Sequence, residues 1–258
     1  MAIAITSGQG GVGKTNVVAN LAVSLAGLGK RVTVLDADSG LANIDVLLGL
    51  APEYNLKNYV LGDVEMEDII LNGPGGTRII PASWGVEQIA DLTIDQQRRM
   101  VCGISSLARE TDYLLVDAGA GVSWNVINFL RASGLVIVVT TPEPESIIDA
   151  YLMVKILAHR EQDKRVLILV NAVTGAGEAQ RAFRAIDSAS RKFLEKPLEL
   201  LGFIETDAKV NDAVRQRRPV VDLYPQSVAS RCVHAIARTL DQQLHSLKRQ
   251  SAGSLSWT

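Results

Sequence analysis

A glycine-rich stretch near the start of the chain constrains the fold more than any other feature. A short apolar run, residues 2–6, leads into a loop with the sequence Gly8-Gln9-Gly10-Gly11-Val12-Gly13-Lys14-Thr15, and a helical pattern follows at once. The spacing Gly-x-x-x-x-Gly-Lys-Thr between a strand and a helix is typical of a phosphate-binding loop. Glycines let backbone N–H groups approach phosphate oxygens, and the following helix directs the positive end of its dipole at the same anion. The pattern therefore predicts that residues 8–15 bind the phosphates of a nucleotide.

Two side chains of this loop have expected tasks of their own. Lys14 supplies a point charge for the outer phosphates of the nucleotide. The hydroxyl of Thr15 suits Mg²⁺, which prefers oxygen ligands. A glycine turn that binds nothing is the alternative, and the register of the loop between a strand and a helix argues against it.

Composition limits the classes of protein to which the chain can belong. Its 258 residues, 47% of them hydrophobic, suffice for a large globular core. The 26 basic and 28 acidic side chains nearly balance, which disfavours a nucleic-acid partner. Cys102 and Cys232 lie far apart without metal-binding spacing, as in the reducing cytosol. Because we find neither a secretion signal nor an apolar run of the roughly 18–20 residues that span a membrane, we expect a cytoplasmic protein.

Apolar strand-like runs alternate with helical patterns along the chain. The expected strands are residues 2–6, 32–36, 79–80, 113–116, 135–140, 166–170 and 198–204. The expected helices are residues 14–26, 95–108, 124–132, 145–159, 178–194, 207–216 and 227–247. This alternation predicts an α/β fold, with a mostly parallel central sheet flanked by helices on both faces. We expect one domain over residues 1–250, followed by a polar tail, residues 251–258.

Carboxylates follow two of the expected strands. Asp36 and Asp38 stand at alternate positions at the end of the second strand, where they can address one site. Asp38 is placed to position or activate an attacking water, and Asp36 to support the shell of the magnesium ion. Asp117 ends the strand 113–116, an arrangement in which the carboxylate holds magnesium. Ordinary turn or helix-cap aspartates are the alternative for all three.

An amide side chain follows a further strand. Asn171 comes directly after the apolar run 166–170. Its carboxamide offers donors and an acceptor to the edge of an adenine. Asparagine is also common in turns, so the residue type alone leaves both interpretations open.

Taken together, these motifs resemble the deviant-Walker ATPases of the MinD/ParA class. Within that class the chain is most similar to the flagellar-number regulators of the FlhG/FleN type. The nucleotide motifs are shared by the whole class. The stretches that favour the flagellar branch are residues 41–50 and 140–151, and further similar stretches are residues 73–76, 201–204, 213–219 and 224–227.

The resemblance implies a P-loop ATPase that forms a homodimer with ATP and Mg²⁺ between its subunits. It implies that Asp38 aligns the attacking water and that Asn171 reads adenine. It places Gly10 and Asp149 near the dimer seam. The residues implied to bind the nucleotide are Gly8, Gln9, Gly10, Gly11, Val12, Gly13, Lys14, Thr15, Asn16 and Asn171, and those implied to bind metal are Thr15, Asp36, Asp38 and Asp117. The implied role is to limit the number or placement of flagella, with a flagellar GTPase and a flagellar transcription activator as partners.

One position departs from the pattern of the class. The class carries a second, signature lysine early in the loop, and this chain has Gln9 there. In the class that lysine reaches the phosphates of the partner subunit, as an arginine finger does. Glutamine donates a hydrogen bond but carries no charge. Three interpretations stay open: a slow ATPase, a nucleotide-bound adaptor with little turnover, or an introduced substitution.

The last helical segment also has two interpretations. Leu240, Leu244 and Leu247 keep helical spacing and are followed by Lys248 and Arg249. The segment is either the last core-packing helix or an amphipathic helix in weak contact with a membrane. The short apolar face favours core packing. A positioning ATPase of the MinD or ParA kind, acting on a membrane or DNA, would call for a longer amphipathic tail or a more basic face.

Overall fold

The computed structural model describes residues 1–38, 44–81, 92–121, 124–161 and 164–253. In this part of the chain, one eight-stranded sheet has the order β3-β4-β2-β5-β1-β6-β7-β8. The strands are β1 (Ala2–Ser7), β2 (Val32–Ala37), β3 (Leu71–Asn72), β4 (Arg78–Ile80), β5 (Tyr113–Ala120), β6 (Leu135–Thr140), β7 (Val166–Val173) and β8 (Glu199–Glu205). All neighbouring strands are parallel except β3 and β4, which are antiparallel. The predicted mostly parallel sheet is confirmed.

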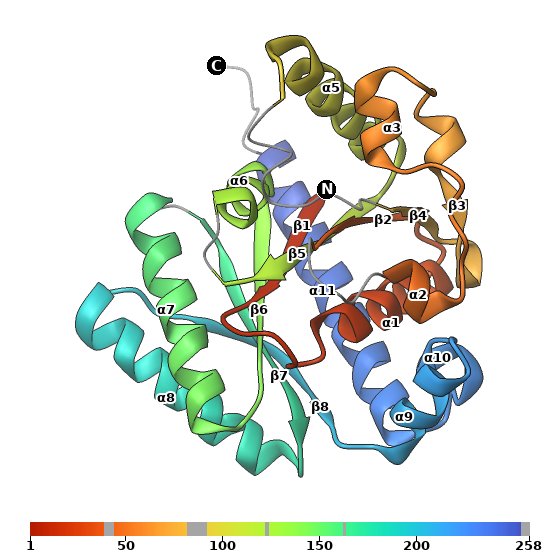
Figure 1. The fold of residues 1–258 in the computed structure, drawn as a ribbon. Coiled ribbons are helices and arrows are strands. Elements are labelled where there is room, and N and C mark those ends of the chain that lie inside the picture. Colours follow the sequence, from red (N-terminus) through yellow and green to blue (C-terminus); the bar gives the residue numbers. More distant parts are fainter. Residues whose placement is uncertain (39–43, 82–91, 122–123, 162–163, 254–258) are drawn as a thin grey trace.

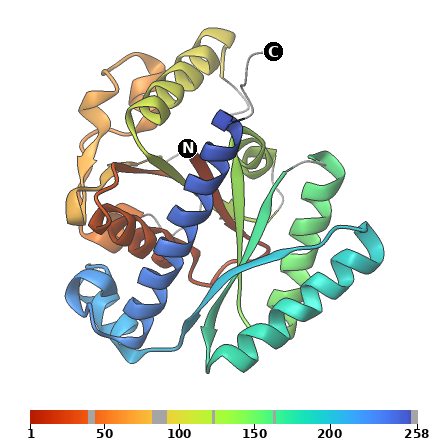
Figure 2. The same ribbon diagram turned by 180° about the vertical axis from the view of Figure 1, so that it is seen from behind.

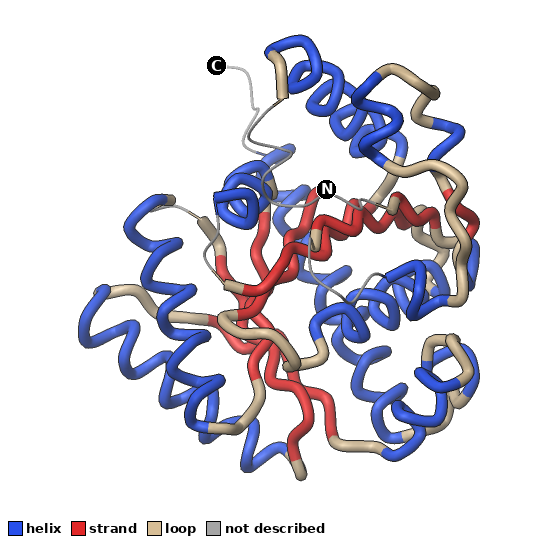
Figure 3. Tube along the Cα trace, viewed as in Figure 1, coloured by secondary structure: helices blue, strands red, loops and turns tan. Residues whose placement is uncertain are grey.

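Helices cover both faces of the sheet (Figures 1 and 3). The α-helices are α1 (Lys14–Gly27), α2 (Ile44–Leu48), α3 (Leu56–Leu61), α5 (Ile94–Glu110), α6 (Trp124–Ala132), α7 (Pro144–Arg160), α8 (Ala176–Leu194), α9 (Ala208–Arg215), α10 (Val220–Leu223) and α11 (Val228–Gly253). Two short 3₁₀ helices are η1 (Glu67–Ile69) and η2 (Pro74–Gly76). Figure 2 shows α11 crossing the face of the sheet opposite to α7 and α8.

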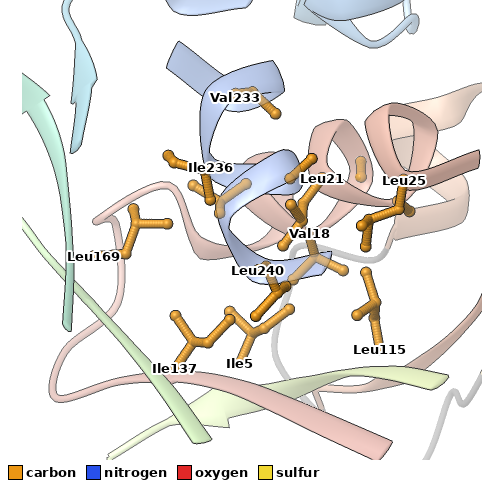
Figure 4. Close-up of a cluster of buried hydrophobic side chains, with 14 of the residues drawn as sticks. Ile5, Val18, Leu21, Leu25, Leu115, Ile137, Leu169, Val233, Ile236 and Leu240 are labelled. Carbon is orange, nitrogen blue, oxygen red and sulfur yellow. The ribbon is translucent and has the colours of Figure 1, made fainter. Parts of the chain in front are cut away.

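Each face of the sheet has its own buried layer because side chains alternate along a strand. On β1, Ile3 and Ile5 belong to the layer under α1 and α11, and Ala4 belongs to the layer under α6 and α7. Figure 4 shows the first layer, in which Val18 and Leu21 of α1 and residues of α11 lie over the strands. Burial on both faces explains why the central strands are continuous apolar runs.

The long elements begin and end within a few residues of their predicted limits, but several short ones were not predicted. Helices α2, α3 and α10 span only 5, 6 and 4 residues, too few to show a helical period. The edge strand β3 has only 2 residues. Strand β7 continues through Asn171 to Val173, so this asparagine lies within the strand and not after it. Helix α11 extends to Gly253, three residues into the predicted tail, and residues 254–258 lie outside the described part.

The leucines of the last helix pack into the core. Leu240 and Leu244 are 0% and 2% exposed and belong to the layer shared with α1. For these two side chains, the core-packing interpretation is confirmed, since a buried leucine cannot face a membrane. The side chain of Leu247 lies outside the described side chains. A search of the described residues finds no helix that is both long and apolar enough to cross a membrane.

Candidate functional site

The glycine-rich loop follows the carboxyl end of β1. In the sheet, β1 lies between its parallel neighbours β5 and β6. Gly11 and Gly13 adopt φ angles of +83° and +84°, which L side chains rarely adopt. Gly13 is also the N-cap of α1, and neither a capping side chain nor an acidic residue in the first turn satisfies this end of the helix. The backbone N–H groups at the start of α1 are therefore available to an anion.

Contacts from three directions hold the loop in this shape. A Cβ atom on Gly8 would lie 2.2 Å from the carbonyl carbon of Asp149 on α7, so only glycine fits there. The Ser7 hydroxyl donates to the Gln9 carbonyl oxygen over 2.7 Å. The Asn171 Nδ2 donates to the Val12 carbonyl oxygen over 2.8 Å. The resemblance placed Asp149 near a dimer seam, and its backbone packs against the first glycine of the loop.

The tip of the loop has no such support. A Cβ atom added to Gly10 or Gly11 would meet no atom within 4 Å, and both residues are exposed. The neighbouring Gln9 is partly exposed, and its side chain makes no hydrogen bond to the part of the chain that the structure describes. These residues are free to meet a ligand or another chain.

Two of the three predicted carboxylates pair with Lys14, and the third, Asp36, lies beside one of them. Strands β2 and β5 are parallel neighbours in which Asp36 pairs with Asp117 in register, so the two side chains lie next to each other. The Lys14 Nζ lies 2.6 Å from Asp117 Oδ1 and 2.9 Å from Asp38 Oδ2. The side chains of Lys14 and Asp117 are 7% and 0% exposed, so this ion pair is buried, whereas Asp38 is 18% exposed and its pair with Lys14 is partly buried. The sheet thus brings together the lysine and the acids that the sequence singled out separately.

Burial and mutual repulsion raise the pKa values of Asp36 and Asp117. Burial, and then the charge of Asp117, raise the pKa of Asp36 to about 7, although backbone N–H groups of Ile44 and Asp38 oppose the shift. Burial also raises the pKa of Asp117, and the charge of Lys14 opposes this shift. Burial lowers the pKa of Lys14, but Asp117 and Asp38 outweigh it and the net pKa is raised. Lys14 is therefore cationic at neutral pH, with two carboxylates as its counter-ions.

The backbone contacts of Asp36 show a second use of this residue. Its Oδ1 accepts a hydrogen bond from Asp38 N over 3.2 Å, and its Oδ2 accepts one from Ile44 N over 3.0 Å. Asp36 therefore fixes the two described residues that flank residues 39–43. The sequence predicted Asp36 only as a support for magnesium.

The donor set suits a magnesium ion that takes its other ligands from phosphates and water. Asp117 Oδ2 is buried and has no hydrogen-bond partner among the described residues, so a cation or its water would satisfy it. The Thr15 hydroxyl is near enough to lower the pKa of Asp117, although it does not complete a hydrogen bond to that oxygen. Among the described residues, no group of three or more His, Cys, Asp or Glu side chains could hold a metal alone. The residues present thus fit Mg²⁺ bound together with a nucleotide, to which the ion would supply charge neutralisation at the outer phosphates.

A cavity of about 280 Å³ opens beside the end of the loop. Gly13 lies at one side, and the walls come from α1, β7, β8, α9, α10 and α11. Its polar side chains include Asn16, Asn20, Asn171 and Asn211. A cavity next to a phosphate-binding loop is placed to hold a nucleoside. Asn16 and Asn171 line it as the predicted nucleotide contacts would, but the Nδ2 of Asn171 is already engaged by Val12.

Two contributors to the site were not predicted. Ser7 holds the Gln9 carbonyl from the last residue of β1. A serine directly before the glycines is a weak local signal for such a bond. The backbone of α7 against Gly8 is a tertiary contact between residues 141 positions apart, and no local pattern in the sequence reveals it.

A model of the CobQ/CobB/MinD/ParA nucleotide binding domain matches residues 3–220. The chain belongs to this family. The match spans most of the 258 residues of this MinD/ParA protein. The predicted resemblance to the MinD/ParA class is confirmed.

Individual relatives of this MinD/ParA protein include an antiactivator and a flagellum site-determining protein. It is 41% identical over 239 residues to the antiactivator FleN of Pseudomonas aeruginosa, covering 93% of this chain and 85% of FleN. It is 34% identical over 243 residues to the flagellum site-determining protein YlxH of Helicobacter pylori, covering 94% of this chain and 82% of YlxH. The predicted similarity to the flagellar branch is confirmed.

A solved structure supports the fold. The septum site-determining protein MinD from Pyrococcus horikoshii OT3, complexed with Mg-ADP, superposes with a TM-score of 0.78 at 25% sequence identity. The match covers 94% of this chain and 96% of that one. The architecture derived above is therefore that of a MinD-like P-loop protein.

Proposed function

We propose that this chain is an ATP-dependent dimerisation switch that regulates the number or placement of flagella. One observation carries the proposal: the cation Lys14 lies at the start of α1, between a preformed loop of backbone amides and two carboxylates. Such a site binds the phosphates of a nucleotide, and the neighbouring acids respond to whether the last phosphate is present. The name of YlxH, a flagellum site-determining protein, and the similarity to FleN expected from the flagellar branch support the flagellar role.

The roles of the residues follow from their positions. The loop amides and Lys14 bind the phosphates, and Thr15 and Asp117 hold magnesium together with Asp36. Asp38 orients the attacking water once Lys14 has moved its charge to the phosphates. The exposed residue Gly10 and the helix α7 that carries Asp149 form part of the dimer face.

A second function differs in turnover. Gln9 stands where the class has its signature lysine, so the partner subunit receives no cation from this position. A cation at this position raises the rate of phosphoryl transfer by about 10³–10⁵-fold. A nucleotide-bound adaptor that binds its partner and hydrolyses ATP little is therefore the alternative to a slow ATPase. In both cases we expect the partner to be a flagellar GTPase, a flagellar transcription activator or both, in the cytoplasm.

The oligomeric state tests the switch. Light scattering after gel filtration measures the mass of the chain without nucleotide, with Mg-ADP and with Mg-ATP, and single-turnover hydrolysis is followed on the same samples. We expect a monomer in the first two conditions and a dimer with Mg-ATP. Lys14→Ala is the control for nucleotide binding and stays monomeric throughout.

The outcomes separate the two functions. A dimer that hydrolyses its ATP within minutes and then dissociates supports the switch. A dimer that persists, with ATP unchanged, supports the adaptor. A chain of unchanged mass that binds no ATP in calorimetry would refute both.

A further inference from the structure

The contact between Asn171 and the phosphate-binding loop joins two parts of the chain that are 159 residues apart. The Asn171 Nδ2 donates to the Val12 carbonyl oxygen over 2.8 Å. The same nitrogen lies 2.6 Å from the position that a Cβ atom on Gly13 would take. The carboxamide thus lies directly against the Val12–Gly13 peptide.

The backbone of β7 is distorted where it presents this side chain. The register between β7 and β8 shifts twice, first between Ile168 and Leu169 and again between Val170 and Val173. Within the second shift, Ala172 has a φ of +57°, in the left-handed region that a residue with a side chain rarely adopts. Strained backbone of this kind persists where the surrounding structure fixes it, often at functional sites. The distortion follows Asn171 by one residue.

The contact determines which way one peptide of the loop points. In a trans peptide the C=O and the N–H point in opposite directions. With the Val12 carbonyl held by Asn171, the Gly13 N–H points to the other side, away from β7. If this peptide turned over, a carbonyl oxygen would face the site where an anion is to bind. The left-handed φ of Gly13 makes such a rotation sterically accessible, so an external contact is needed to prevent it.

We propose that Asn171 is a positioning residue for the phosphates: it holds the Val12–Gly13 peptide in the orientation that binds an anion, whatever base is attached. This inference rests on the proposed nucleotide site and changes the expected role of Asn171, which the resemblance gave as a reader of adenine. The effect of Asn171 therefore extends to ligands that have no base.

The test uses a ligand without a base or sugar. Isothermal calorimetry measures the affinities of the wild-type chain and of Asn171→Ala for Mg-ATP, Mg-ITP and Mg-tripolyphosphate. The loss of one net hydrogen bond lowers a binding affinity by a factor of about 5–10. We expect Asn171→Ala to lower the affinities for tripolyphosphate and for ATP by the same factor. The ratio of the ATP affinity to the ITP affinity should stay unchanged.

Two further variants sharpen the result. Asn211 lines the same cavity, but its carboxamide makes no hydrogen bond to the loop. Asn211→Ala therefore changes the contacts to the nucleoside and leaves the affinity for tripolyphosphate unchanged. Asn171→Asp keeps the shape of the side chain but replaces the donor by a carboxylate that repels the Val12 carbonyl. We therefore expect it to lower the affinity for tripolyphosphate more than Asn171→Ala does. If Asn171→Ala does not fold, as judged by thermal unfolding, Asn171→Ser provides the same comparison.

The outcomes are distinct. Unchanged tripolyphosphate affinity in Asn171→Ala, with weaker ATP and a changed ratio of ATP to ITP, would overturn the inference and restore adenine reading. Unchanged affinity for all three ligands would overturn it as well. A wild-type chain that binds none of them refutes the proposed nucleotide site itself, which is a different result.

Discussion

The phosphate-binding loop after β1 and the carboxylates near the carboxyl ends of β2 and β5 meet at Lys14, but different forces hold them. Neutral hydrogen bonds and close packing fix the loop: Asn171 holds Val12, Ser7 holds Gln9, and α7 covers Gly8. Charge holds the other side, where Asp38 and Asp117 are paired with Lys14. In the proposed function, a nucleotide enters the first region as it stands and competes with the carboxylates for the lysine in the second.

This difference explains how one site can both bind and respond. In the proposed function, the loop binds phosphate without rearrangement, since its amides and its left-handed glycines are already in place. The carboxylate side changes its partners when Lys14 turns to phosphate, and Asp36 connects that change to α2 through its bond to Ile44. A fixed region thus provides affinity, and a region held by exchangeable ion pairs provides the signal.

The largest expected effect comes from removing the group that the two regions share. Lys14→Ala should weaken ATP about 10³-fold or more, because charge-assisted hydrogen bonds to phosphates are among the strongest in proteins. Calorimetry checks this, with Lys155→Ala, an exposed lysine of α7, as the matched control. An affinity within a factor of two of the wild type would refute the assignment of the site.

Gln9→Lys adds a cation at the tip of the loop and leaves its anchored residues unchanged. We expect ATP turnover to rise by about 10³-fold, the lower end of what a finger residue contributes, with little change in ATP affinity. Steady-state phosphate release and calorimetry measure the two quantities. The matched control is Gln9→Met, which is similar in length but uncharged and should leave turnover low. If Gln9→Lys leaves turnover unchanged, either another cation already stabilises the phosphates or the site is inactive for a different reason.

Gly8→Ala tests the packing that fixes the loop. The new Cβ would clash with the backbone of Asp149, so we expect a loss of about 3 kcal/mol in the free energy of unfolding. Gly10→Ala is the matched control, because open space surrounds that position and stability should change by less than about 0.5 kcal/mol. Urea unfolding measures both. Equal stability of the two variants would show that α7 does not support the loop.

The titration of Asp36 tests the charged region in the nucleotide-free protein. Its folded pKa of about 7 exceeds the ordinary value of 3.8, so the folded state binds the proton more tightly than the unfolded state. The contribution of Asp36 to the free energy of unfolding is therefore fully present below pH 3.8, and it is lost as the pH rises through about 7. The slope is at most about 1.4 kcal/mol per pH unit. Urea unfolding at several pH values should show this slope in the wild type but not in Asp36→Asn. A slope that persists in the variant would assign the titration to another group.

The sequence predicted the fixed region better than the charged one. The spacing of residues 8–15 implied both the loop and the helix behind it, because that motif specifies its own backbone. The carboxylates near the ends of β2 and β5 were also predicted, but β5 continues to Ala120, so Asp117 lies within this strand and does not end it as predicted. The adjacency of Asp36 and Asp117 follows from strand order, which the sequence does not give. The pairing of Lys14 with both acids was not predicted, since the motif suggested phosphate as its partner.

The role of Asn171 shows the same limit. Its place near the ends of the strands followed from the apolar run before it, but the bond to Val12 depends on a shift in register and on the left-handed Ala172. Local patterns do not encode such a distortion, because it arises where β7, β8 and the loop pack together.

A structure of the chain with Mg²⁺ and a non-hydrolysable ATP analogue tests the central claim most directly. We expect the backbone of residues 7–13 to superpose on the present structure within about 1 Å, with the Asn171–Val12 bond intact. We expect the Lys14 Nζ to lie on the phosphates and to have left Asp38. A structure in which the loop has rebuilt itself while Lys14 still pairs with Asp38 and Asp117 would contradict the account.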